Sequence, residues 1–181
     1  DQRAINSMLD VFKVVREIRE HMEAVAGLAS EMNLKLNQAG VCLDENLIHC
    51  SALLHDMCRS SRGHERMAAM ELRRRGYLRA ARVVELHHGG EFSRNFDEGQ
   101  LLFLAGKMVC GTQRVSIEER FALSLGKCRT QPARAAHAGR LLQTRQAAKK
   151  YESLLNGTEY TFFEHTPIVD EAVSHISWKI S

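Results

Sequence analysis

The segment Ala52-Leu53-Leu54-His55-Asp56-Met57 places a histidine and an aspartate side by side within apolar sequence. Apolar residues on both sides of it recur at helical spacing, which predicts a helix through this segment. On that helix His55 would share an inward face with Leu47 and Cys58, and Asp56 would be turned away from it by about 100°. A buried imidazole or carboxylate is costly unless it has a partner or binds a metal ion. The dipeptide itself is common, so its meaning depends on what accompanies it.

More histidines lie on both sides of this pair. His21 precedes it, and His64 and the doublet His87-His88 follow it, each on or beside a stretch with helical periodicity. Any one of them alone would more often be a satisfied core histidine than a ligand. Several imidazoles with a carboxylate, however, suit a borderline divalent metal such as iron, manganese, zinc, cobalt or nickel. The set therefore predicts a metal centre where the fold brings these side chains together.

The apolar pattern predicts an all-α fold of roughly seven to eight helices. A single apolar stripe from Met8 to Leu36 predicts one long first helix. Asp44 is expected to cap the second helix, Gly76 to end the third, and Ser116 with Glu119 to form a capping box. No stretch alternates with the period of two that is typical of a half-buried strand. Further helices are expected over residues 78–88, 101–109, 132–155 and, as a short closing helix, 167–178.

Length and charge narrow the function classes. A chain of 181 residues is expected to form a single domain over residues 1–181. The net charge of +3 would help to attract an anionic substrate but does not indicate nucleic-acid binding. The basic run Arg73–Arg75 has no interleaved aromatic residues, and the end of a helix explains it. No run reaches the roughly 20 apolar residues that a membrane span requires, so we expect no membrane partner.

The cysteines and the start of the chain bear on its context. Five cysteines without a CxxC pair argue against a zinc ribbon and against a disulfide framework. Reduced thiols and a cytoplasmic location are therefore expected. The sequence begins with Asp1 rather than methionine, which leaves open that it is part of a larger protein. The amphipathic segment 132–155 packs on the same core or forms a contact in a homo-oligomer, and the sequence does not separate these two alternatives.

Taken together, these segments resemble the HD-domain metal-dependent phosphohydrolase superfamily. The resemblance spans a motif core from His21 to Phe121, and the fold is extended over the C-terminal helices, residues 132–181. It implies an HD-domain-like helical bundle. The matching segments are Arg19–His21, Ala52–Met57, Gly63–Glu65, Ala81–His88, Leu104–Lys107 and Val115–Phe121.

The resemblance implies roles for individual residues. His21, His55 and Asp56 would hold a first metal ion, and Asp56 would bridge to a second ion held by His64 and His87, with His88 as a substitute or an addition. One or two ions would activate a water molecule as the nucleophile. The substrate would be a phosphorylated small molecule or a nucleotide. His55, Asp56 and Lys107 would be the catalytic residues, and Lys107, Arg59, Arg62 and Arg114 would contact phosphates, although solvated surface charge explains each of these four equally well.

Gly106 departs from the family pattern, which has an aspartate ligand of the first metal at this position. Glycine offers no ligand and costs roughly 1 kcal/mol relative to alanine in a helix interior. Three outcomes stay open: water replaces the carboxylate, Glu91 or Asp97 moves in, or the first metal site is weakened.

Two main functions follow. The first is a metal-dependent phosphohydrolase or phosphodiesterase. The alternative is a degenerate HD domain that binds metal or ligand in regulation, with little turnover because of Gly106. A helical interaction module without metal is a third reading, but it does not explain the aligned ligands. The chain is also similar to HD domains appended to nucleotidyltransferase-like proteins, which would make it one module of a larger enzyme.

Overall fold

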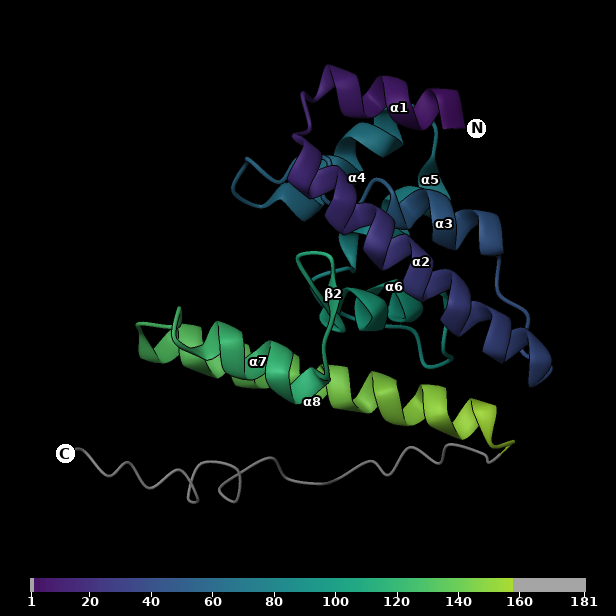
Figure 1. Cartoon of the computed structure of the whole chain (residues 1–181), viewed down its shortest axis with the longest axis vertical. Helices are drawn as coiled ribbons and strands as arrows, with labels where there is room; N and C mark the ends of the chain where they lie inside the picture. Colours follow the sequence, from purple (N-terminus) through teal and green to yellow (C-terminus); the bar gives the residue numbers. More distant parts are fainter. Residues whose placement is uncertain (1, 158–181) are drawn as a thin grey trace.

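Helices dominate the computed structural model, which describes residues 2–157 (Figure 1). This confirms the all-α class. The helices are α1 (Gln2–Val11), α2 (Arg16–Gln38), α3 (Glu45–Ala52), α4 (His64–Arg74), α5 (Leu78–Glu85), α6 (Glu98–Lys107), α7 (Ile117–Leu125) and α8 (Gln131–Leu155).

The prediction of a single long first helix is wrong, because a turn separates α1 from α2. Lys13 adopts a positive φ of 50° there, and the amide of Val14 donates to the carbonyl of Leu9. The apolar stripe nevertheless continues on both sides of the break: Met8 in α1 and Met22 in α2 are each at most 4 % exposed. Since both pieces bury the same stripe, hydrophobic periodicity could not reveal the turn between them.

A short hairpin is the second departure from the expected helices. β1 (Val109–Cys110) pairs antiparallel with β2 (Gln113–Arg114). The turn between them contains Gly111 at a φ of 60°, a left-handed conformation that glycine adopts without strain. Strands of two residues are too short to show alternation, which is why the pattern did not predict them.

The predicted helix ends are largely confirmed. The Asp44 carboxylate accepts from the Leu47 amide at 3.0 Å, and Gly76 follows α4 with a φ of 84°. Ser116 and Glu119 form the capping box of α7, and proline occupies the first turn of α8. The closing helix expected over residues 167–178 lies outside the described residues.

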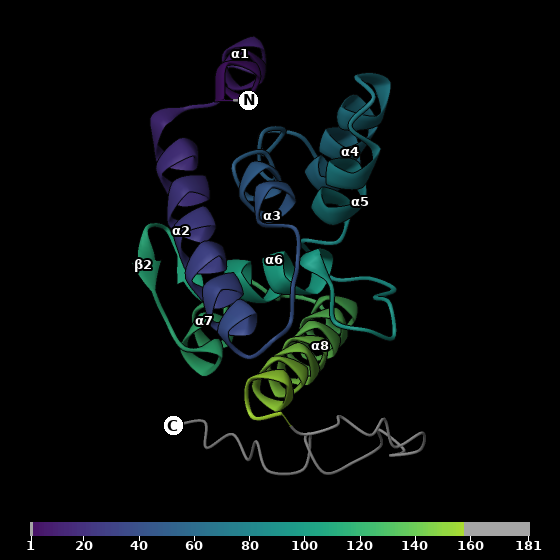
Figure 2. The same cartoon turned by 90° about the vertical axis from the view of Figure 1, so that its right-hand side faces the viewer.

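Helix α6 lies between α8 and the group formed by α3 and α5, with α2 along one side (Figure 2). Its residues Leu101–Ala105 are at most 1 % exposed, so α6 is the central core element. The Tyr151 hydroxyl of α8 donates to the carbonyl of Met32 in α2 at 3.1 Å and joins the outer helices. Among residues 2–157, no helix combines the length and the apolar character needed to cross a membrane.

Candidate metal centre

The pair His55-Asp56 lies in a series of tight turns after α3. The helix was expected to run to Cys58, but it ends at Ala52. The amides of Leu54, Met57 and Arg59 then donate to carbonyls three residues earlier, rather than four. Such turns place consecutive side chains differently from an α-helix. His55 Nε2 consequently lies 3.6 Å from Asp56 Oδ2, so both side chains reach the same point.

Backbone carbonyls orient three of the histidines. The Nδ1 atoms of His21, His55 and His87 lie 2.6, 2.7 and 2.6 Å from the carbonyl oxygens of Gly111, Ala52 and Val84, respectively. Because a carbonyl only accepts, each Nδ1 carries the proton, and Nε2 of the neutral ring then holds a lone pair. Metal-binding histidines are commonly held in this way. The sequence offers no signal for these carbonyls, since they belong to the backbone.

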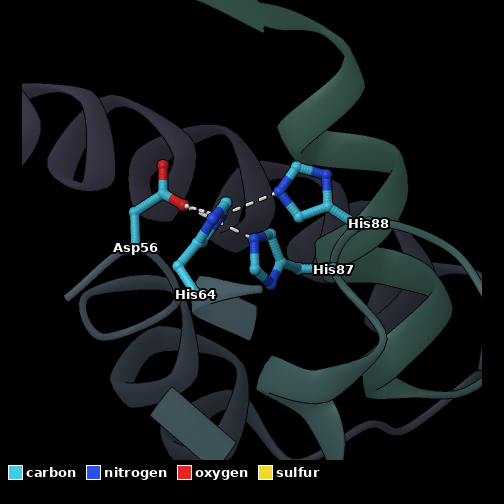
Figure 3. Close-up of side chains that lie close together, drawn as sticks. All are labelled: Asp56, His64, His87 and His88. Carbon is cyan, nitrogen blue, oxygen red and sulfur yellow. Dashed lines mark hydrogen bonds and ion pairs between the residues drawn. The ribbon is translucent and has the colours of Figure 1, made fainter. Parts of the chain in front are cut away.

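The Nε2 atoms surround the carboxylate of Asp56, which has no exposed surface. The atoms His64 Nε2 and His87 Nε2 lie 3.0 and 3.4 Å from Oδ1, and His21 Nε2 lies 3.8 Å from Oδ2. His88 adds a further ring, with its Nε2 2.9 Å from His64 Nε2. Figure 3 shows Asp56, His64, His87 and His88 directed toward one another from three separate segments.

This arrangement fits a bound cation. Asp56 Oδ1 and His87 Nε2 are buried 3.4 Å apart, and neither atom has a hydrogen-bond partner. A lone pair on Nε2 facing a carboxylate oxygen is repulsive, and a metal ion between them would satisfy both atoms. The residues therefore suit a divalent transition metal.

Two overlapping groups of ligand atoms share Asp56. The three-ligand centre comprises His21, His55 and Asp56. The four-ligand centre comprises Asp56, His64, His87 and His88, so it includes both members of the histidine doublet. Within each group the ligand atoms lie within 4.8 Å of one another. These are the six residues that the resemblance assigns as metal ligands.

Burial favours the neutral form of three histidines, His55, His87 and His88. It lowers the pKa of His55 to about 3 and the pKa of His88 to about 2, and in both cases the adjacent His87 adds to the shift. Burial likewise lowers the pKa of His87. Burial opposes ionisation of Asp56, but its contacts with His64 and His87 hold the pKa of this carboxyl below its usual range. At neutral pH the imidazoles of His55, His87 and His88 are therefore uncharged and the Asp56 carboxylate is ionised, which is the form that binds metal.

We expect the metal-free protein to lose stability as the pH falls. In the unfolded chain His55 gains a proton near its ordinary pKa of 6.5. In the folded chain it gains the proton only near its lowered pKa of about 3. Between these two pH values the unfolded state binds more protons than the folded state, so the free energy of unfolding decreases as the pH decreases. The slope is up to about 1.4 kcal/mol per pH unit for each such histidine. Denaturant unfolding in chelator at several pH values measures it.

The variant His88→Gln should make the dependence of the unfolding free energy on pH shallower. The matched control His49→Gln should leave this dependence unchanged. His49 is exposed in α3 and belongs to neither group of ligand atoms. A free energy of unfolding that stays constant from about pH 7 to pH 4 would contradict the buried, neutral state of the histidines.

Arg59 contacts Asp56 directly. Its Nη1 donates to Asp56 Oδ2 at 2.7 Å, on the oxygen that faces His21 and His55. The Arg59 side chain is 45 % exposed, so it can turn outward without disturbing the core. In this position the guanidinium neutralises the oxygen that the three-ligand centre would use.

Changing Arg59 to glutamine is therefore expected to tighten metal binding at the three-ligand centre. Removing a cation that competes for Asp56 Oδ2 should raise the affinity roughly tenfold, or about 1.4 kcal/mol. Titration with cobalt(II), followed by absorbance, measures it. Arg62→Gln removes the same charge from an exposed position nearby and serves as the control. Equal or weaker cobalt binding by the Arg59 variant would rule out competition.

The other basic residues that were expected near the substrate lie in different settings. Lys107 is 8 % exposed, and its Nζ donates to the His87 carbonyl at 3.0 Å. Arg114 pairs with Glu31 of α2 on the exposed surface, and its phosphate contact stays a prediction. Arg62 is exposed in the loop before α4. The catalytic role of Lys107 stays a prediction, while its position supports His87 from the backbone side.

Gly106 is half-buried in α6, and a Cβ atom built on it would meet nothing within 4 Å. The space for a side chain is therefore open. Neither acidic residue suggested as a replacement belongs to the two ligand groups. Asp97 instead caps the other end of α6, where it accepts from the Gln100 amide at 3.0 Å, and Glu91 is exposed.

A cavity of about 630 Å³ lies apart from these ligands, between α8 and the loop before α6. None of the residues that line it is a candidate metal ligand. Its lining residues are Gly90, Phe92, Ser93, Arg94, Gln100, Gln143, Gln146, Ala147 and Lys150. The metal centre is thus defined by side-chain chemistry and not by this cavity.

Comparison with known proteins agrees with the geometry. A family model of the HD domain matches residues 18–118, more than half of the chain. No curated protein and no solved structure matches the chain. The matched span contains all the residues of the three-ligand and four-ligand centres. The chain therefore belongs to the HD-domain family, within the metal-dependent phosphohydrolase superfamily.

Proposed function

We propose that this protein is a metal-dependent phosphohydrolase or phosphodiesterase that acts on a phosphorylated small molecule or nucleotide. The observation that carries the proposal is the convergence of imidazole lone pairs on the buried, ionised carboxylate of Asp56. Neutral imidazoles that face a carboxylate destabilise a protein core, but the same groups bind a divalent cation well.

Each residue of the centre has a definite part in this proposal. Asp56 is shared by both groups of ligands and would set their spacing. The carbonyls of Gly111, Ala52 and Val84 hold the rings of His21, His55 and His87 with Nε2 free. A bound divalent metal would supply an activated water and would neutralise charge that develops on a phosphate.

The basic residue beside the centre would then meet the substrate. The Arg59 guanidinium lies directly at the centre, where it donates to Asp56. Because its side chain is partly exposed, it can release Asp56 and donate to a phosphate oxygen instead. Arginine binds phosphate through paired hydrogen bonds, which orient it as well as attract it. Arg59 would thus change partners once the charge of Asp56 is satisfied by metal.

The test is a panel of phosphate esters and nucleotides with added manganese, cobalt or iron. The variant His55→Ala with Asp56→Ala serves as the negative control. We expect turnover of at least one class of phosphate compound by the native chain and its loss in the double variant. Unchanged bound metal and unchanged hydrolysis in the double variant would sink the proposal.

A regulatory role is the second candidate, and Gly106 favours it. With only three protein ligands at one centre, the chain would bind metal or a ligand with little turnover. The same panel separates the two functions. Metal binding with no hydrolysis of any compound would favour the regulatory role, whereas hydrolysis that depends on His55 would exclude it.

A further inference from the structure

Helices α7 and α8 form an antiparallel pair with a well-defined register. Ser124 Oγ lies 2.9 Å from His137 Nε2, and the rings of Phe121 and His137 pack edge to face at 5.1 Å. Farther along the pair, Arg145 lies 3.6 Å from Glu118. As the residue numbers fall along α7 they rise along α8, so these contacts fix which residues face each other.

That register brings Arg120 and Arg140 together. Arg120 lies one turn before Ser124 in α7, and Arg140 lies nearly one turn after His137 in α8. Both side chains are half-buried. The Nε atom of Arg120 is buried without a hydrogen-bond partner. Within residues 2–157, no carboxylate forms an ion pair with either arginine, whereas Arg145 one turn farther on has Glu118.

Lys107 adds a third cation to this pair. Burial is the main cause that lowers the pKa of Lys107 to about 7, and the charges of Arg120 and Arg140 come next, ahead of the opposing charge of Asp56. Their charges therefore act on the buried ammonium at the end of α6, the helix against which α8 packs. The same ammonium donates to the carbonyl of His87, so the cations lie beside the four-ligand centre.

The Asp56 carboxylate acts on Lys107, but it belongs to the metal ligands, and no carboxylate among residues 2–157 forms an ion pair with Arg120 or Arg140. Like charges held together in this way repel one another, and burial strengthens the repulsion. An anion placed between them would relieve this repulsion and would supply the acceptor that Arg120 Nε lacks. A phosphate group suits two guanidiniums, because its oxygens accept several hydrogen bonds at once. The sequence did not single out these arginines, since they are separated by a loop and become neighbours only through the helix pair.

We propose that Arg120 and Arg140, with Lys107 behind them, form an anion-binding site for a second phosphate group of the substrate. This rests on the proposed function, in which a first phosphate lies at the metal ligands. It narrows the substrate class to compounds that carry at least two linked phosphates, such as a diphosphate or a nucleoside polyphosphate.

Pyrophosphate and inorganic phosphate are the probes, and calorimetric titration of the full chain in chelator is the measurement. Without metal, binding reports the arginine site alone. We expect pyrophosphate to bind, and the variant Arg120→Gln with Arg140→Gln to bind it at least tenfold more weakly. Arg145→Gln is the matched control, because it removes an arginine of α8 that already has a carboxylate partner, and it should bind as the native chain does. The single variant Arg140→Gln leaves the buried Nε of Arg120 in place, so misfolding is not expected to explain its effect. It too should bind pyrophosphate more weakly.

The outcomes separate this site from the proposed function. If pyrophosphate binding depends on the arginines but no compound is hydrolysed, the anion site is supported and the proposed function is contradicted. Metal-dependent hydrolysis together with equal pyrophosphate binding by native and variant chains would overturn the anion site and keep the function. No binding of pyrophosphate by the folded native chain would also overturn it.

Discussion

Changing Asp56 to asparagine is expected to remove metal from both centres and, under the proposed function, to lower hydrolysis strongly. Asp56 is the only residue that belongs to both ligand groups, and it supplies their only carboxylate. Asparagine keeps the shape of the side chain but loses the charge that offsets the cation. We expect bound metal to fall to near zero and turnover to fall roughly 1,000-fold, which corresponds to about 4 kcal/mol of transition-state stabilisation.

The control for this variant is Asp10→Asn, which makes the same chemical change on an exposed residue of α1. Circular dichroism in chelator checks that both variants fold, since Asp56 also contacts Arg59. Full metal content in the Asp56 variant would mean that the imidazoles bind the ion without the carboxylate. That result would contradict the assignment of Asp56 as the shared ligand.

Changing Gly106 to aspartate is expected to strengthen the three-ligand centre. The family resemblance places a metal-binding aspartate here, and the structure leaves open space around a Cβ atom at this position. A fourth ligand would complete the site that now comprises His21, His55 and Asp56. We expect the metal content to rise by about one ion per chain, with hydrolysis rising at least about tenfold. Elemental mass spectrometry and the substrate panel measure the two effects.

Gly106→Asn is the matched control, because it fills the same space without a carboxylate. If metal content and turnover rise equally in both variants, the gain comes from the helix and not from a ligand. If neither rises in the aspartate variant, position 106 does not reach the three-ligand centre. The first site would then be formed by its three residues and solvent alone.

The features that could be predicted from the sequence depend on residues close together in the chain. Asp44, Ser116 and Glu119 cap helices through bonds to amides three residues away, so their types and spacing are sufficient. The candidate ligand set could be proposed from the sequence because imidazole and carboxylate have few low-cost roles in a core. A break such as that at Lys13 could not be found, because the apolar stripe runs through it unchanged.

The features that were missed depend on contacts between distant segments. Arg114 pairs with Glu31 of a helix far away in sequence, which the pattern did not reveal, and its phosphate contact stays a prediction. Gly111 in the hairpin supplies the carbonyl that orients His21, which no side-chain pattern reveals. The ammonium of Lys107 is held at the His87 carbonyl, 20 residues away in sequence, and its catalytic role stays a prediction. Periodicity indicates which face of a helix is buried, but not what packs against it.

The most direct test of the metal centre is the number of transition-metal ions per chain, measured by mass spectrometry on untagged protein purified without chelator. At least about one tightly held ion per chain is predicted, because the four-ligand centre has a complete set of protein ligands. About two would show that solvent completes the three-ligand centre despite Gly106. A folded protein that holds no metal, even after manganese, iron, cobalt or zinc is added back, would contradict the account.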